Sequence, residues 1–200
     1  MSYFITVNSN DFEDMCKKDQ LGCISYDTVE PDDNSSGKSC DKGSALESVL
    51  CCIGLQKFID AQDHGYSFGE TYSTALSEIK CGYKSTHWMW YVFPQITLPG
   101  VTGTTAYFSI KDLSEAKDYY SHPILGTRLL EITRELLNLD TDDPVSVFGL
   151  TDAFKLRACM TLFKYAVPEQ TLFQDVLNKY CQGIEDEMTL DMISHYDGWS

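Results

Sequence analysis

The sequence has few basic residues for its length. Its 200 residues include 15 lysines and arginines against 30 aspartates and glutamates, which gives a formal net charge of -15 at pH 7. Proteins that bind duplex nucleic acid or anionic membranes need a cluster of basic residues at the contact surface. We therefore expect neither duplex nucleic acid nor a membrane as the main partner, although a small basic pocket within an acidic surface is compatible with this charge.

Long hydrophobic runs are also missing. No stretch approaches the roughly 18 consecutive apolar residues of a membrane-spanning helix, and residues 1–10 lack the basic start and apolar core of a signal peptide. We therefore expect a cytoplasmic protein. Hydrophobic residues make up 43% of the chain, which at this length is enough for one domain with a substantial core.

Motifs for common metals and cofactors are absent. The eight cysteines contain no C-x-x-C pair, so no structural zinc site is expected and the cysteines are predicted to be free thiols. The sequence also has no P-loop, no G-x-G-x-x-G turn, no H-E-x-x-H helix and no G-x-S-x-G elbow. We predict no bound metal and no cofactor, and the enzyme classes that these motifs define are disfavoured.

The composition changes near Lys42. Residues 27–43 are rich in Asp, Ser and Gly and contain almost no large apolar side chain, so packing cannot offset the entropy lost on ordering them. We expect residues 1–43 to form a flexible acidic N-terminal extension, whose protein partner the sequence does not identify. Residues 44–200 are expected to form a single compact multihelical domain.

Helix signals dominate from Ser44 onward and predict a mainly α fold. A capping box at residues 44–47 predicts a helix that continues to about Gln62. A second helix is expected from Tyr72 to a glycine stop at Gly82. Further helices are predicted to begin at Asp112, at His122-Pro123 and at Thr151-Asp152, and to cover residues 172–180 and 186–193.

Two neighbouring segments depart from this helical pattern. Residues 88–94 (WMWYVFP) are too continuously bulky for an amphipathic surface helix and predict a buried aromatic element. If this element is extended, its side chains alternate between two faces and both faces must be covered. Residues 98–103 predict a flexible loop. A buried aromatic element beside a glycine-containing loop is a favourable place for a ligand pocket.

Candidate ligand-binding residues lie in and around the aromatic element. Trp88 and Trp90 offer flat surfaces on which a base or a sugar can stack, although both are equally compatible with a purely structural core role. Lys84 and Gln95 add a cation and an amide at the two ends of the run. His87 is a candidate catalytic residue, although a lone histidine in such a place is more often a capping or core residue.

Other candidates come from the helices. Asp152 and Lys155 lie on one helical face, where they form either a simple surface ion pair or a carboxylate and a cation of a site. Arg128 has the chemistry to bind a phosphate in bidentate fashion, or it is a solvated helix charge. Asp60 lies near the end of the first predicted helix, where an acid opposes the helix dipole, and is a candidate catalytic carboxylate.

Taken in order, these segments resemble the domain-of-unknown-function 1810 family. The matching segments are residues 58–62 (FIDAQ), 84–95 (KSTHWMWYVFPQ), 115–116 (EA), 122–129 (HPILGTRL) and 148–163 (FGLTDAFKLRACMTLF). One departure is Tyr91, which stands where the family usually has Phe. Members are often labelled calpastatin-like, but these residues give no reason to expect a protease inhibitor. The resemblance implies a compact, mainly helical intracellular domain and very little about activity.

The order of the elements is also faintly similar to that of the helical NADAR proteins, which act on ADP-ribose or related N-glycosides. This similarity implies an enzyme in which Trp88 or Trp90 stacks a base and Lys84 and Arg128 bind phosphate oxygens. A carboxylate, either Asp152 or Asp60, would then act at the anomeric carbon. The alternative is a protein-interaction module without catalysis. We favour a site for a small nucleotide-like ligand, and the sequence leaves open whether a reaction follows.

Overall fold

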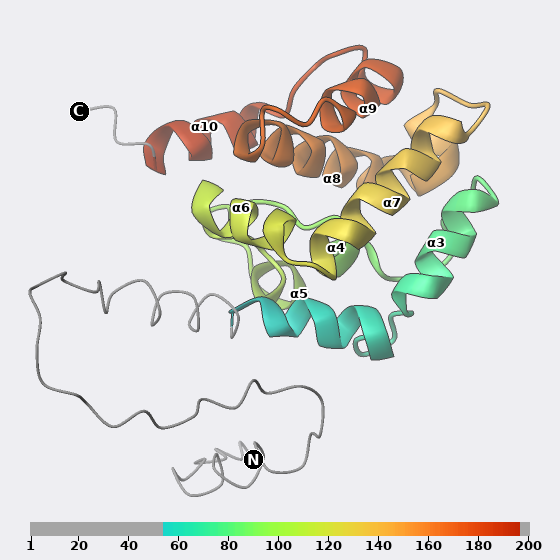
Figure 1. Ribbon diagram of the computed structural model, residues 1–200, viewed down its shortest axis with the longest axis horizontal. Helices are drawn as coiled ribbons and strands as arrows, with labels where there is room; N and C mark the ends of the chain where they lie inside the picture. The colour runs from blue at the N-terminus through green and yellow to red at the C-terminus, as the bar shows by residue number, and fades with distance from the viewer. Residues whose placement is uncertain (1–53, 197–200) are drawn as a thin grey trace, which may run out of the picture. The chain divides into compact units, whose positions relative to one another are not determined.

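The structure is a computed structural model that describes residues 54–196, and these residues form a compact bundle of α-helices (Figure 1). The mainly α class and the multihelical domain predicted from the sequence are confirmed for this part of the chain. The acidic extension at residues 1–43 and the capping box at residues 44–47 lie outside the described residues. Between residues 54 and 196, no helix is long and apolar enough to cross a membrane.

The helices follow one another with short connections. The first covers residues 54–64, and it is followed by α3 (Tyr72–Lys80), α4 (Met89–Val92), α5 (Gly103–Tyr107), α6 (Leu113–Ser121), α7 (Leu125–Asn138), α8 (Pro144–Ala166), α9 (Leu172–Cys181) and α10 (Glu187–Tyr196). The long helix α8 packs against α6, α9 and α10, while α7 packs against α3, α6 and α9 (Figure 1). These two helices therefore hold the bundle together.

The predicted ends of α3 and α6 are confirmed by their hydrogen bonds. Helix α3 stops where Gly82 takes a positive φ of 76° and donates its N–H to the carbonyl of Ile79, while Tyr83 N–H donates to Glu78. This is a Schellman stop, which needs a residue without a Cβ in the left-handed region. Helix α6 begins at Asp112, whose carboxylate accepts the Glu115 N–H as predicted.

The starts of α7 and α8 differ from the predictions. Pro123 is not the first residue of α7, because the Nδ1 atom of His122 accepts the N–H groups of Ile124 and Leu125 and the helix begins at Leu125. Helix α8 begins at Pro144, but Gly149 has a non-helical backbone (φ 72°, ψ 165°) that interrupts it. The helical part after Gly149 begins close to the start predicted at residues 151–152.

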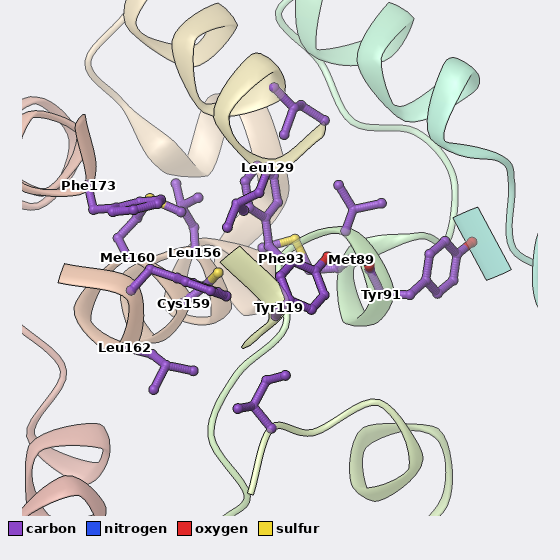
Figure 2. Packing of buried hydrophobic residues seen from close by; sticks show 14 of the residues in the cluster. Met89, Tyr91, Phe93, Tyr119, Leu129, Leu156, Cys159, Met160, Leu162 and Phe173 are labelled. Atoms are coloured by element: carbon purple, nitrogen blue, oxygen red, sulfur yellow. Dashed lines mark hydrogen bonds between the residues drawn. The ribbon is translucent and has the colours of Figure 1, made fainter. Parts of the chain in front are cut away.

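The aromatic element is buried, as predicted, but it is not extended. Met89–Val92 form the single helical turn α4, and Trp88, Tyr91 and Phe93 are all 1% exposed or less. Figure 2 shows Met89 and Phe93 in one apolar cluster with side chains of α6, α7 and α8. Because Met89, Tyr91 and Val92 of α4 are all buried, a nearly continuous run of bulky residues is compatible with a helical turn.

The segment after α4 is a loop as predicted, followed by a short helix that was not predicted. Residues 98–102 are irregular, and α5 begins at Gly103. The chain then returns beside α4, because Thr97 N–H donates to Ile110 and Ile110 N–H donates to Gln95 in an isolated parallel bridge. These bonds close the segment of residues 95–110 into a loop against the aromatic element.

Helices α6 and α7 approach each other most closely at Gly126. A Cβ atom at this position would lie 1.8 Å from the backbone oxygen of Tyr120 in α6. No side chain can occupy that space without moving one of the helices.

We expect Gly126→Ala to lower the free energy of unfolding by about 3 kcal/mol, because α6 and α7 must separate to admit the methyl group. Urea denaturation measures the change. Gly54→Ala is the matched control, since a Cβ there would lie 3.7 Å from the nearest atom, a Glu115 carboxylate oxygen. Equal stability of Gly126→Ala and the unmodified protein would contradict this close crossing.

Candidate functional site

A pocket of about 280 Å³ opens beside the aromatic element. The turn between the first helix and α3 forms one wall, the start of α4 forms the opposite wall, and α5 contributes one residue. The lining residues are Tyr66, Ser67, Phe68, Gly69, His87, Trp90, Tyr91 and Thr104. The pocket lies next to the aromatic element, but the predicted partner of that element, the loop of residues 98–103, lines the smaller second cavity instead.

Short hydrogen bonds join the two walls of the pocket. The Tyr91 hydroxyl lies 2.6 Å from the carbonyl oxygen of Glu70 and 3.0 Å from that of His87. A Cβ atom on Gly69 would lie 2.2 Å from the carbonyl oxygen of His87, so only glycine fits at this contact. Burial also raises the pKa of the Tyr91 phenol, which stays a neutral hydrogen-bond donor.

Aromatic side chains stand exposed at the rim of the pocket. Phe68 is 91% exposed, and Tyr66 stacks on Tyr107 of α5 with ring centroids 5.6 Å apart. An apolar ring held almost wholly in water is unfavourable by itself, and exposed aromatic groups beside a pocket are typical of binding surfaces. The sequence analysis missed these residues. The signal was present, because residues 65–69 read GYSFG, two aromatic residues between glycines.

Trp90 is the central side chain of the site. Its half-buried ring lines the main pocket and also a smaller cavity of about 20 Å³ that includes Gln95. The indole Nε1 atom is buried and has no hydrogen-bond partner within the part of the chain that the structure describes. Leaving a buried donor unpaired costs roughly 1–3 kcal/mol. An acceptor that reaches this atom would recover that free energy.

Three charged side chains meet behind Trp90. The ammonium of Lys155 lies 4.6 Å from the centre of the Trp90 ring and 2.8 Å from Asp152. Lys84 lies 2.7 Å from the other oxygen of Asp152 and donates to the carbonyl of Thr86. The structure therefore brings Lys84 to Asp152 and Lys155, which lie far from it in the sequence. One carboxylate faces two ammonium groups, so the cluster has a surplus positive charge.

Asp152 stays ionised in this cluster. Partial burial by itself would raise the pKa of its carboxyl, but the hydrogen bonds and charges of Lys155 and Lys84 outweigh it and hold the pKa below its usual value. Asp152 is therefore a fixed negative charge that holds both lysines in place.

A second carboxylate fixes the segment that leads into α4. Glu78 of α3 accepts hydrogen bonds from Ser85 and Thr86 and, at 2.8 Å, from the indole N–H of Trp88. Partial burial would raise the pKa of Glu78, but these hydrogen bonds lower it to about 2. Trp88 itself is completely buried and packs against Phe93 and Phe148, so it lies in the core rather than in either pocket.

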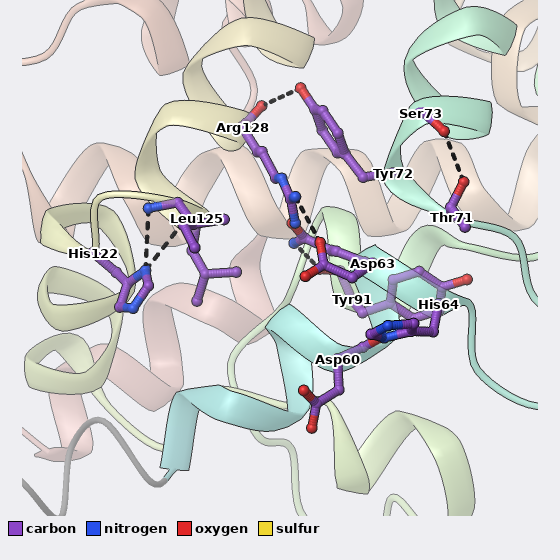
Figure 3. Close-up of polar contacts among 12 residues, drawn as sticks. Asp60, Asp63, His64, Thr71, Tyr72, Ser73, Tyr91, His122, Leu125 and Arg128 are labelled. Atoms are coloured by element: carbon purple, nitrogen blue, oxygen red, sulfur yellow. Dashed lines mark hydrogen bonds and ion pairs between the residues drawn. The ribbon is translucent and has the colours of Figure 1, made fainter. Parts of the chain in front are cut away.

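Arg128 and Asp60 lie in a different part of the structure (Figure 3). Arg128 of α7 forms a 2.6 Å ion pair with Asp63 and also reaches the amide oxygen of Gln62. Asp60 is exposed and accepts a hydrogen bond from Gln56 one turn earlier in the helix. The structure does not bring either residue to Lys84, Asp152 and Lys155.

Gln62 links the Arg128 cluster to the back of the pocket. It is 2% exposed, and its side-chain N–H group donates to the carbonyl of Tyr91 and to the hydroxyl of Tyr119. The sequence analysis did not single out Gln62, because a polar residue at the end of a predicted helix gives no sign of burial.

His87 is exposed at the mouth of the pocket, and Gln95 lies beside the smaller cavity. Of the predicted site residues, His87, Trp90 and Gln95 therefore line a cavity, and Lys84, Asp152 and Lys155 lie behind Trp90. No group of three or more metal-binding side chains occurs among residues 54–196.

Comparison with known proteins identifies the family. The family model described as "Protein of unknown function (DUF1810)" matches residues 52–193, most of the chain. The chain belongs to the DUF1810 family. All the residues that line the pocket lie within the match. So do Lys84, Asp152 and Lys155, which we call the lysine cluster. The resemblance predicted from the sequence is thus confirmed.

A solved structure supports the fold of this DUF1810 domain. The crystal structure of the conserved hypothetical protein Rv1873 from Mycobacterium tuberculosis is similar, with a TM-score of 0.66 and 33% sequence identity. The similar region covers 72% of this chain and 98% of that chain. A search of curated proteins gives no match. Neither the family description nor the name of the solved protein states an activity.

We expect Glu78→Gln to lower the free energy of unfolding by about 1–2 kcal/mol at neutral pH, because charge-assisted hydrogen bonds to Ser85 and Trp88 are lost. The ordinary pKa of 4.5 is lowered to about 2 in the folded state, so this stabilisation is complete above pH 4.5 and is lost as the pH falls towards 2. Urea denaturation from pH 7 downward should show the two proteins converging. Glu169→Gln, at an exposed glutamate, is the control, and a difference independent of pH would contradict this role.

We expect Asp152→Asn to lower the free energy of unfolding by about 2 kcal/mol, because two ammonium groups lose their counter-charge while remaining largely buried. Lys155→Met should have a smaller effect, since Asp152 keeps its pairing with Lys84. Thermal and urea unfolding of both variants measure the difference. An Asp152→Asn protein as stable as the unmodified one would show that the cluster does not hold this part of the fold together.

Proposed function

We propose that the pocket beside Trp90 binds a small nucleotide-like ligand, which combines a flat ring with a negatively charged group. The observation that carries this proposal is the Trp90 ring, which lines the pocket with the Lys155 ammonium over it, while its buried Nε1 donor has no partner among the described residues. A flat ring stacks on Trp90, an acceptor atom pairs with the indole N–H, and an anionic group is attracted by the lysine cluster.

The size of the pocket supports a ligand of this kind. Small-molecule sites typically enclose about 300–1,000 Å³, and the pocket of about 280 Å³ suits a base or a nucleoside. The remainder of a larger molecule, such as ADP-ribose, would extend over the exposed rim at Phe68. The charge also fits, because the surplus of one positive charge in the lysine cluster stands out in a chain of net charge -15.

If a reaction follows binding, His87 has the appropriate chemistry. His87 lines the pocket and can transfer a proton to or from a ligand. Asp152, the other candidate catalytic carboxylate, lines neither cavity and has both oxygens paired with lysines, so we assign it to holding Lys84 and Lys155 in place. The position of Asp60 beside Gln56, and of Arg128 beside Asp63, gives them no contact with this group of residues.

We expect Trp90→Phe to weaken ligand binding about tenfold, because it keeps a flat ring but removes a donor worth about 1.4 kcal/mol. Trp90→Ala should abolish binding. A thermal-shift screen with adenosine, AMP, ADP, ADP-ribose and NAD identifies the ligand, isothermal titration measures its affinity, and analysis of the products tests for turnover. Tyr83→Ala is the control, since Tyr83 is an exposed aromatic residue that lines neither pocket.

Two results would contradict this proposal. One is the absence of a thermal shift with every compound, and the other is binding that Trp90→Phe and Trp90→Ala leave unchanged.

A second function is supported by the exposed rim. Phe68, Tyr66 and Tyr107 form an aromatic surface, and aromatic residues are enriched at the centres of protein interfaces. A protein-interaction module would use this surface without breaking any bond. It predicts no response to the small molecules above, and a partner whose binding is lost in Phe68→Ser.

A further inference from the structure

The charge behind Trp90 bears on which ligands the site accepts. Resting on the function proposed above, we propose that Lys155 makes the site selective against positively charged rings, so that the ring seated on Trp90 is neutral or carries negative charge. Lys155 thereby determines specificity without forming part of the pocket wall.

Lys155 is well placed to control the indole ring. Its ammonium lies 4.6 Å from the ring centre, yet Lys155 lines neither the main pocket nor the smaller cavity. The cation therefore approaches Trp90 from outside both cavities. A cation over an aromatic face is attracted by the negative charge of that face. The indole ring of Trp90 therefore already interacts with a positive charge before any ligand binds.

The ammonium cannot easily swing away from the ring. Asp152 holds Lys155 at 2.8 Å, and the same carboxylate is held at 2.7 Å by Lys84. Lys84 is in turn fixed by the Thr86 carbonyl, and its side chain is only 7% exposed. A reorientation of Lys155 would leave a largely buried carboxylate with less of its counter-charge.

Asp152 does not cancel the charge of Lys155, because it also pairs with Lys84. The three groups together carry one surplus positive charge. Other charged side chains near the pocket are Lys57, 5.7 Å from the centre of the Tyr107 ring and facing Glu115, and Glu70, which is exposed beside Tyr91. Glu78 is also close, but its carboxylate is engaged by Ser85, Thr86 and Trp88. Lys57 adds positive charge at the rim, whereas the exposed carboxylate of Glu70 is screened by water.

A cationic ring stacked on Trp90 would be repelled by this surplus charge across the thickness of the indole. At an effective dielectric constant suited to partly buried groups, the repulsion corresponds to about a tenfold loss of affinity relative to an uncharged ring of the same shape. A ligand carrying a phosphate or a carboxylate would gain affinity from the same field.

The first test needs no ligand. Fluorescence quenching by iodide and by caesium is measured in the unmodified protein, in Lys155→Met and in Lys155→Arg, and Trp90→Phe identifies the Trp90 signal. Each quenching constant is divided by that for free tryptophan, because iodide is intrinsically the more efficient quencher. On this scale iodide should quench Trp90 more efficiently than caesium, although the net charge of -15 favours caesium elsewhere on the protein. Lys155→Arg should keep this preference and Lys155→Met should lose it. Preferential quenching by caesium in the unmodified protein would overturn the proposal.

The second test uses pairs of rings that differ by one methyl group and one charge, guanosine with 7-methylguanosine and nicotinamide with 1-methylnicotinamide. We expect the neutral member to bind about tenfold more tightly in the unmodified protein and in Lys155→Arg. The difference should fall below about twofold in Lys155→Met, whose folding is checked by its unfolding transition.

The possible failures are distinguishable. Binding that depends on Trp90 but ignores ring charge would overturn the selectivity and leave the proposed function standing. If no ring binds while iodide quenching follows Lys155, the nucleotide-like ligand is wrong, and with it the selectivity that rests on it.

Discussion

The architecture of the site depends on the carboxylate of Glu78. This one group collects hydrogen bonds from the segment that connects α3 to α4, including the indole N–H of the buried Trp88. A buried indole donor needs an acceptor, and an ionised carboxylate is the strongest one available to it. With Glu78 in place, Trp88 is seated in the core and the next tryptophan, Trp90, is turned towards the pockets.

The two tryptophans of the aromatic element show how neighbouring residues of one type come to serve different purposes. Trp88 is fully buried, with its donor satisfied and its ring packed on Phe93 and Phe148. Trp90 is half-buried, its donor has no partner within residues 54–196, and the Lys155 ammonium lies over its ring. One is therefore explained by stability alone, whereas the other carries an energetic cost that a ligand can relieve.

The charges of the protein are distributed so that the site differs from the rest of the chain. The sequence as a whole is strongly acidic, yet Asp152 holds two lysines within 3 Å and leaves a positive surplus behind Trp90. A local positive charge inside an acidic protein has little competition from other cations for an anionic group, and its effect is strengthened by partial burial. The side-chain geometry of this chain therefore provides a chemical hypothesis for the DUF1810 family, to which the chain belongs.

The sequence by itself determined the longer helices, several of their ends and the burial of most of residues 88–93, although not the short helices α4 and α5. Local signals suffice for these features: Asp112 accepts the Glu115 N–H at the start of α6, and Gly82 ends α3 because a left-handed residue is needed there. The sequence also placed a candidate ligand site beside the aromatic element, which stays a prediction. It did not distinguish Trp88 from Trp90, and it missed Tyr66, Phe68 and Gln62. Only the tertiary structure decided that Lys84 and Lys155 share Asp152 while Arg128 pairs with Asp63 instead. The reason is physical, because helix ends depend on neighbours within one turn, whereas an ion pair depends on how α8 and the segment before α4 pack together.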